Sequence, residues 1–107
     1  MLTITIRKED EAMFNNQRYL TRGVEAEIPL TLQLFMWGCI DRLPAERDYF
    51  QVFRLEPMGE MMQRITHESE QPAYKKVYLI PTDNPIAQKL YVIDSDEYST
   101  MLLASEY

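Results

Sequence analysis

The chain has 107 residues, a length typical of one domain that builds a hydrophobic core without disulfides or metals. Seventeen acidic and eleven basic residues give a formal net charge of −6, which argues against a nucleic-acid backbone as the main partner, because phosphate binding needs a basic field. We therefore expect no direct sequence-specific binding to nucleic acid, whereas a basic protein partner is compatible with this charge.

The cysteine content and the apolar runs indicate a soluble cytoplasmic protein. Cys39 is the single cysteine and falls on the predicted core face of a helix, where a free thiol behaves as a small hydrophobe. No secretory signal is visible, and the longest apolar run, residues 34–39, is too short to cross a bilayer. The prediction is a reducing compartment and no membrane contact.

The first expected element is a short strand at residues 2–6. Its sequence, LTITI, alternates apolar and threonine side chains, which is typical of a half-buried strand, and the charged residues 7–11 end it. This strand is expected at an edge of the sheet or as an addition to it.

The longest helical pattern in the chain runs over residues 28–43. Its core face is predicted from apolar residues at i, i+3, i+4, i+7, i+8 and i+11, namely Leu32, Phe35, Met36, Cys39, Ile40 and Leu43. Pro29 suits a first helical position, and Pro44 follows the last periodic residue. Leu30, Leu34 and Trp37 form a second apolar row, so we expect this flank to meet a second layer or a partner.

Short strands follow the helix. Residues 49–55 carry apolar side chains on both faces, as a central strand does, and residues 61–67, 74–80 and 89–94 also read as strands between turn sequences. His67 is expected to be a surface or rim histidine. Asp94 and Glu97 resemble a helix capping box, but the alternation from Tyr98 onward favours a hairpin turn at 95–96.

These elements predict an α+β fold, with one long helix packed on an antiparallel sheet of about five or six strands. The expected core is apolar and is drawn from both layers. It comprises Leu32, Phe35, Met36, Ile40, Phe50, Val52, Phe53, Val77, Leu79, Tyr91 and Ile93.

Catalytic and metal-binding patterns do not stand out in the sequence. It contains no glycine-rich phosphate loop, HExxH, CxxC or GxSxG motif. Asp94 and Asp96 could hold Mg²⁺, but acidic residues at i and i+2 are common in solvated turns. We therefore predict no catalytic residue, no cofactor and no metal site.

Three sequence blocks, YLTRGV from Tyr19, IPLTLQ from Ile28 and YSTMLL from Tyr98, occur in the order found in a family of small uncharacterised proteins of Gram-positive bacteria. The chain resembles this family, domain of unknown function nine-sixty, over residues 13–107. The resemblance implies a single domain at 13–107, with residues 1–12 as an N-terminal extension. It also implies an origin on plasmids, phages or other mobile elements, and a relationship to a type II-A anti-CRISPR protein.

Charge, motifs and resemblance together predict a non-enzymatic acidic protein-binding module of a mobile element. Its expected partner is the type II CRISPR effector nuclease or its complex with guide RNA, inhibited by phosphate mimicry, by wedging or by blocked guide assembly. The alternatives are a structural or regulatory adaptor of another partner, or a small enzyme that uses an acidic cluster. The candidate partner-binding residues combine acidic and aromatic side chains, namely Glu25, Glu27, Trp37, Asp94, Asp96, Glu97 and Tyr98.

Overall fold

The computed structural model describes residues 13–107, so the strand predicted at residues 2–6 and the role of the extension 1–12 lie outside the described part of the chain. The elements follow one another as β1 (Gln17–Leu20), α2 (Arg22–Glu27), α3 (Leu30–Asp41), β2 (Phe50–Pro57), β3 (Met62–Glu70), β4 (Ala73–Pro81), β5 (Gln88–Asp94), β6 (Tyr98–Leu103) and the 3₁₀ helix η1 (Ala104–Glu106). Within residues 13–107, no helix is long and apolar enough to span a membrane.

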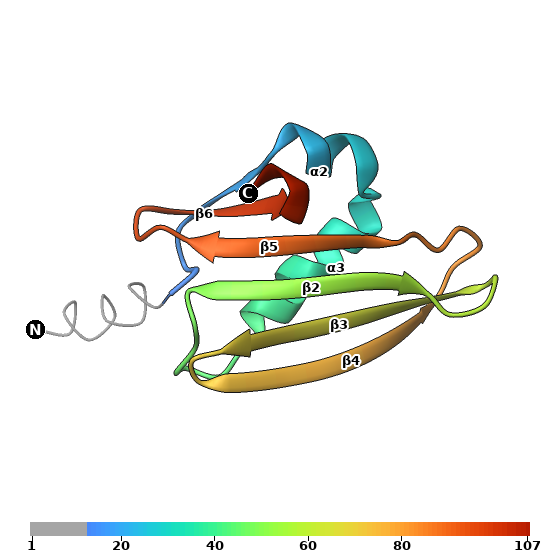
Figure 1. The fold of residues 1–107 in the computed structure, drawn as a ribbon. Coiled ribbons are helices and arrows are strands. Elements are labelled where there is room, and N and C mark those ends of the chain that lie inside the picture. Colours follow the sequence, from blue (N-terminus) through green and yellow to red (C-terminus); the bar gives the residue numbers. More distant parts are fainter. Residues whose placement is uncertain (1–12) are drawn as a thin grey trace, which may run out of the picture.

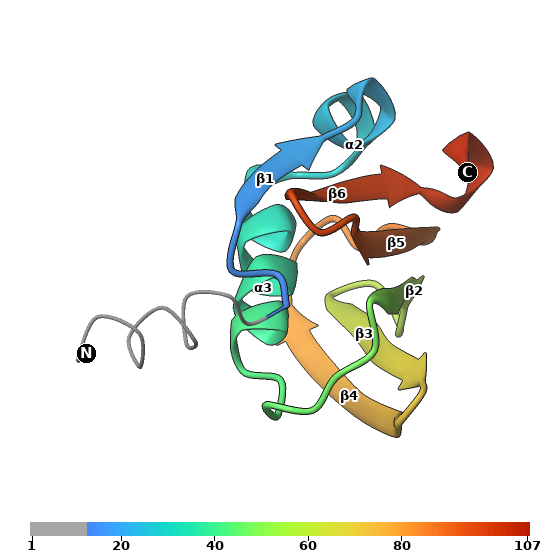
Figure 2. The same ribbon diagram turned by 90° about the vertical axis from the view of Figure 1, so that its left-hand side faces the viewer.

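The six strands form one mixed sheet in the order β1-β6-β5-β2-β3-β4 (Figure 1). Four strand pairs are antiparallel, whereas β1 runs parallel to β6. The hairpin predicted near residues 95–96 is confirmed, because Asp94 of β5 pairs with Ser99 of β6. Figure 2 shows α3 on one side of the twisted sheet, with β1 and β4 at opposite edges.

The predicted fold class, α+β with one long helix on an antiparallel sheet, was wrong. Among the described residues the fold is mostly sheet, with 45% strand and 22% helix, and α3 alone reaches seven residues. Ile28 is the C-cap of α2, so α3 starts only after Pro29, and it ends at Asp41 after twelve residues. Leu43 is buried outside the helix, which explains why apolar spacing overestimated the helix length.

The helix α3 covers one face of the sheet and fixes which side of each strand is buried. Met36, Cys39 and Ile40 on its inner side have no exposed surface. The amide of Gln33 is also buried, and its Nε2 donates a 2.8 Å hydrogen bond to the carbonyl oxygen of Ile28. This bond satisfies a carbonyl at the tight connection between α2 and α3.

The core prediction was correct for Phe53 and for the inner residues of α3, but it chose the wrong face of β4 and β5. Phe53 in β2 and Leu90 and Val92 in β5 are fully buried beneath α3, whereas their neighbours along each strand, including predicted core residues, point to the opposite, open face. On the edge strand β4, Val77 and Leu79 are each 53% exposed. Because these strands are apolar on both sides, alternation cannot tell which side a helix covers.

Two carboxylates hold the parallel edge of the sheet. Asp94 accepts 2.9 Å hydrogen bonds from the backbone N–H of Phe14 and from Nδ2 of Asn16, just before β1. At the other end, Glu106 accepts hydrogen bonds from the Thr21 hydroxyl, from the Gly23 N–H and from the Leu103 N–H, at 2.5, 3.0 and 2.9 Å. These donors lower the pKa of the Glu106 carboxyl. Side-chain bonds therefore position β1, which is only four residues long.

Gly23 makes the contact with Glu106 possible. A Cβ built at this position would lie 2.7 Å from Cδ of Glu106 and 2.7 Å from Cδ1 of Leu103. These distances are shorter than van der Waals contact, so a larger residue at position 23 would displace the ends of the Glu106 and Leu103 side chains.

His67 was predicted at the surface but is fully buried, which corrects that interpretation. Its ring stacks on Phe53 at 4.2 Å between centroids, and Tyr74 meets it edge-on. The amide nitrogen of Gln51 donates a hydrogen bond to the carbonyl oxygen of Asp48. The amide oxygen of Gln51 therefore faces Nε2 of His67 at 2.7 Å and accepts a hydrogen bond from the N–H at that position. Among the described residues Nδ1 has no hydrogen-bond partner, so a proton on it would be buried without an acceptor, which favours the neutral ring.

Burial and the nearby cations Arg42 and Lys76 lower the pKa of His67 from 6.5 to about 4. The folded state therefore binds fewer protons than the unfolded state, and stability falls as the pH drops from 6.5 through 4.

The first prediction concerns the inner face of α3. Met36→Ala should lower the free energy of unfolding by about 2 to 5 kcal/mol, because the truncation leaves a cavity in the core. Leu34→Ala is the matched control, since this side chain is 62% exposed and its loss should change stability by less than about 0.5 kcal/mol. Urea unfolding of both variants checks this, and equal losses would contradict the described helix face.

The second prediction concerns acid stability. Between pH 7 and pH 4 the wild type should lose about 3 kcal/mol more of its free energy of unfolding than His67→Gln. Only the wild type has an imidazole that is neutral when buried and takes up a proton when unfolding exposes it. Urea unfolding at both pH values isolates this difference, since the carboxylates titrate in both proteins. If the two proteins lost the same stability over this range, His67 would not be buried and neutral as described.

Candidate functional site

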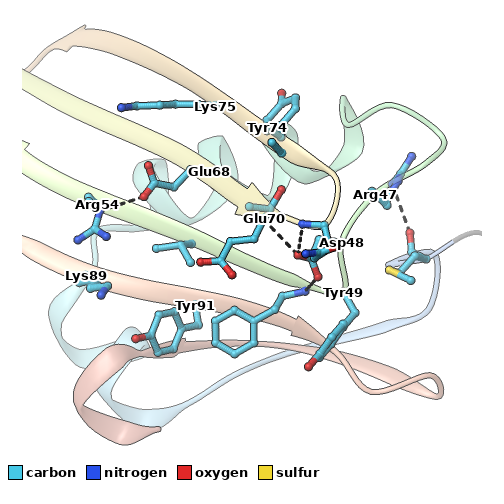
Figure 3. A pocket seen from close by; sticks show the side chains of 16 residues that line it. Arg47, Asp48, Tyr49, Arg54, Glu68, Glu70, Tyr74, Lys75, Lys89 and Tyr91 are labelled. Atoms are coloured by element: carbon cyan, nitrogen blue, oxygen red, sulfur yellow. Dashed lines mark hydrogen bonds and ion pairs between the residues drawn. The ribbon is translucent and has the colours of Figure 1, made fainter.

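A wide hollow lies on the open face of the sheet, opposite α3. It has a volume of about 1020 Å³ and is lined by residues from β2, β3, β4 and β5 and from the segments before β2 and between β3 and β4 (Figure 3). We call this hollow the open-face groove. Its walls are strands of one continuous sheet, so the backbone beneath it is held rigidly.

Aromatic rings gather along one side of the open-face groove. Phe50 lies 4.8 Å from Tyr91 between ring centroids, and Tyr107 meets both rings edge-on at 5.5 and 5.3 Å. Tyr49 contacts the other edge of Phe50 at 6.2 Å. Tyr49 and Tyr107 are 55% and 76% exposed, so this cluster offers apolar ring surface and hydroxyl groups to solvent.

The charged side chains of the open-face groove are mixed in sign. Four basic residues and three acidic residues line it, so it carries one net positive charge in a chain of net charge −6. Arg54 and Glu68 pair across β2 and β3 at 3.3 Å (Figure 3). Lys89 lies 5.6 Å from the centroid of the Tyr91 ring. Within the described chain, no ion pair involves Lys75 or Lys89, and both remain available to a ligand.

Asp48 shapes the groove wall and is not a free acid. Its Oδ2 accepts hydrogen bonds from the backbone N–H groups of Glu70 and Gln71 at 3.2 and 2.9 Å, and its Oδ1 accepts one from Phe50 at 3.1 Å. The side chain is nearly buried, at 9% exposure. The carboxylate therefore ties the turn after β3 to the start of β2 and fixes the rim.

The five acidic residues predicted at the partner site do not form one patch. Glu25 and Glu27 lie in α2, beyond the end of β6, whereas Asp94, Asp96 and Glu97 lie at the β5–β6 turn, where β6 starts (Figure 1). A six-residue strand separates the two groups, a length of roughly 20 Å.

Several of these acids also have structural roles. Asp94 binds the segment before β1, and its Oδ1 accepts the N–H of Asp96 at 2.9 Å. Asp96 has a φ of 81°, the left-handed conformation that aspartate tolerates in a turn. Glu27 accepts a hydrogen bond from Nε2 of Gln88 at 2.9 Å. Glu25 and Glu97 are exposed.

The two predicted aromatic anchors lie on different sides of the sheet. Trp37 belongs to α3, and the guanidinium of Arg18 lies 4.7 Å from the centroid of its ring. Arg18 also pairs with Asp41 at 2.5 Å, so it bridges β1 and the helix. Tyr98 is 44% exposed on the open face, where it meets Tyr19 edge-on at 5.6 Å, outside the groove lining.

Sequence reasoning missed the aromatic cluster of the groove. Phe50 and Tyr91 were assigned to the core, and Tyr107 was not selected. The pairing of Val52 with Tyr91 brings β2 and β5 together, and the chain end then returns over them. The available signal was the pair of apolar faces on these strands, because a sheet covered by one helix leaves the second face open.

Cys39 is a free cysteine that is buried in the core. Burial raises the pKa of the Cys39 thiol above its ordinary value, as expected for a thiol that packs in the core. In residues 13–107, no group of three or more His, Cys, Asp or Glu side chains could hold a metal ion.

The chain is similar to known proteins in its fold and in its sequence family. A solved structure of a protein of unknown function from Enterococcus faecalis is similar to it, with a TM-score of 0.75 and 18% identity, covering 91% of this chain and 95% of that one. This likeness concerns the fold alone. No curated protein matches the chain.

The family model that matches residues 17–106 is described as staphylococcal protein of unknown function (DUF960). Neither description mentions an anti-CRISPR protein, a phage or a plasmid, so those parts of the resemblance stay predictions. The family expected from the three sequence blocks is confirmed, and the chain belongs to the DUF960 family of proteins of unknown function.

Proposed function

We propose that this chain is a non-enzymatic protein-binding module that holds an extended segment of its partner in the open-face groove. The observation that carries the proposal is a cluster of partly exposed aromatic rings beside unpaired lysines, on a sheet face that no helix of the described chain covers. Tyrosine and phenylalanine are enriched in protein interfaces because they provide large contact areas at a low cost in side-chain entropy.

The charges of the groove favour an acidic or mixed partner segment. Lys75 and Lys89 are free to pair with carboxylates of a partner, while the Arg54–Glu68 pair can hydrogen-bond to its backbone. A single positive net charge is small, so electrostatics would set register and association rate more than affinity. The apolar contact with the rings would supply most of the binding energy.

The partner proposed from the family resemblance is the type II RNA-guided nuclease, and the groove suggests how the contact would form. Phosphate mimicry needs a contiguous acidic surface, but the acidic candidates are divided between the two ends of β6. We favour wedging, in which the aromatic groove takes a segment of the nuclease and the flanking acids meet its basic surface. A structural or regulatory adaptor of another protein would use the same groove.

A pull-down tests the identity of the partner. The tagged full chain would be incubated with lysate from a host that expresses a type II effector, with and without guide RNA, and plasmid uptake would be measured in parallel. Recovery of the effector together with restored plasmid uptake supports the nuclease as partner. Absence of both would remove the nuclease from the proposal.

The third prediction tests the aromatic cluster beside the groove, where Tyr107 packs on the lining residues Phe50 and Tyr91. Tyr107→Ala should weaken binding of the recovered partner about tenfold, because truncating an interface aromatic typically costs more than about 1 kcal/mol. Tyr98→Ala is the matched control on the same sheet face, outside this aromatic cluster, and should change the dissociation constant less than about twofold. Isothermal titration calorimetry measures both. A larger effect at Tyr98 than at Tyr107 would place the interface elsewhere on the open face.

A further inference from the structure

The strand β4 forms one edge of the sheet, and only one of its sides is paired. Its nine residues pair without interruption with β3, from Met62↔Pro81 to Glu70↔Ala73. No strand of the described chain lies on the other side, where alternate backbone N–H and C=O groups point outward. Such an edge readily pairs with another strand, and natural proteins usually block it.

Few of the usual blocking devices protect β4. Its proline, Pro81, is the last residue of the strand, and the uninterrupted register with β3 leaves no bulge. Val77 and Leu79 expose apolar surface on the open face, at 53% each. The charged residues of the strand are Lys75 and Lys76, its third and fourth residues, and they oppose pairing only in registers that bring lysines together. A long, apolar edge of this kind is favourable for strand pairing.

We propose that β4 pairs with β4 of a second copy of this chain, antiparallel, across a two-fold axis that is perpendicular to the sheet and passes midway between the two Val77 residues. Val77 would lie opposite the Val77 of the other copy, and all nine residues of the strand would be paired. This inference is independent of the proposed function. It names a second copy of the chain as the occupant of the edge.

The positions of the two lysines select this register. When Val77 is at the centre, Lys75 lies opposite Leu79 and Lys76 lies opposite Tyr78. Each ammonium group then extends beyond an apolar or aromatic neighbour, whose surface the lysine stem covers. No like charges face each other. Each side chain also lies on the same face of the joined sheet as the residue with which it pairs.

The neighbouring symmetric registers are less favourable. A two-fold axis perpendicular to the sheet pairs residues that lie on the same face. Moving the centre of the pairing by one residue along the strand therefore changes the partner of every residue by two positions. A register centred on Lys75 or Lys76 places that lysine directly opposite the same lysine of the other copy, and the repulsion between the two like charges is destabilising. A register centred on Tyr78 avoids the lysines but pairs only seven residues, from 75 to 81. The register through Val77 therefore combines full length with separated charges.

The pairing would join two sheets into one continuous sheet. Because the axis is perpendicular to the sheet, the open faces of both copies point to the same side, and so do the two α3 helices. The open-face groove reaches β4 at Ala73, Tyr74 and Lys75, so the second copy would extend its rim with the side chain of Leu79.

Charge variants at the centre test both the dimer and its register. Wild type should have the mass of two chains by light scattering at about 100 µM, whereas Val77→Lys and Val77→Glu should each be monomeric, because each places like charges opposite one another. An equimolar mixture of the two variants should recover the dimeric mass, since lysine then faces glutamate. Only a register in which residue 77 pairs with itself gives this result.

Leu34→Lys on the exposed side of α3 is the matched control and should remain dimeric. Circular dichroism checks that all variants are folded, which is expected because residue 77 is exposed. A monomeric wild type, a dimeric Val77→Lys variant, or a mixture that stays monomeric would each overturn the proposal. Dimerisation that is lost in Leu34→Lys would assign the interface to the helix instead.

Discussion

The structure depends on one constraint, which is that a single twelve-residue helix covers one face of a six-stranded sheet. Side chains alternate along each strand, so in β2, β5 and β6 every second residue is buried on the side of α3, and the intervening residues lie on the opposite, open face. Phe53 and Leu90 lie in the core, while Phe50 and Tyr91, one residue away, form the aromatic wall of the groove. The fold and the candidate site are thus two consequences of the same pairing of β2 with β5.

The polar residues on the covered side explain how the groove is held in place. Asp48, Gln51 and His67 form a chain of hydrogen bonds from the rim of the groove into the core. The bond between Gln51 and His67 and the bond from Glu70 to Asp48 both join β2 or the segment before it to β3. A neutral buried histidine stacked on Phe53 adds ring area to the core, but it also makes stability sensitive to acid. The groove is therefore supported by contacts that tolerate little change.

Local patterns predicted what depends on neighbouring residues. The inner face of α3 around Met36 and Ile40, the strands β2 to β6 and the β5–β6 hairpin were all visible as periodicity or turn chemistry. Long-range choices were not visible. Apolar side chains occupy both faces of β2 and β5, so the covered face could not be assigned, and the parallel pairing of β1 depends on bonds to Asp94 and Glu106 across the chain. The burial of His67 and the contact of Tyr107 with Phe50 likewise follow from tertiary packing alone.

The division of the sheet into a covered and an open face is the central claim, because the groove and the β4 edge both rest on it. Methyl NMR with a water-soluble paramagnetic agent measures this division residue by residue. The methyl signals of Val77 and Leu79 should broaden strongly, while those of Ile65, Leu90 and Val92 should keep their intensity, since they have no exposed surface. Equal protection of the two groups would mean that a further layer covers the open face, and strong broadening of Leu90 or Val92 would contradict the position of α3.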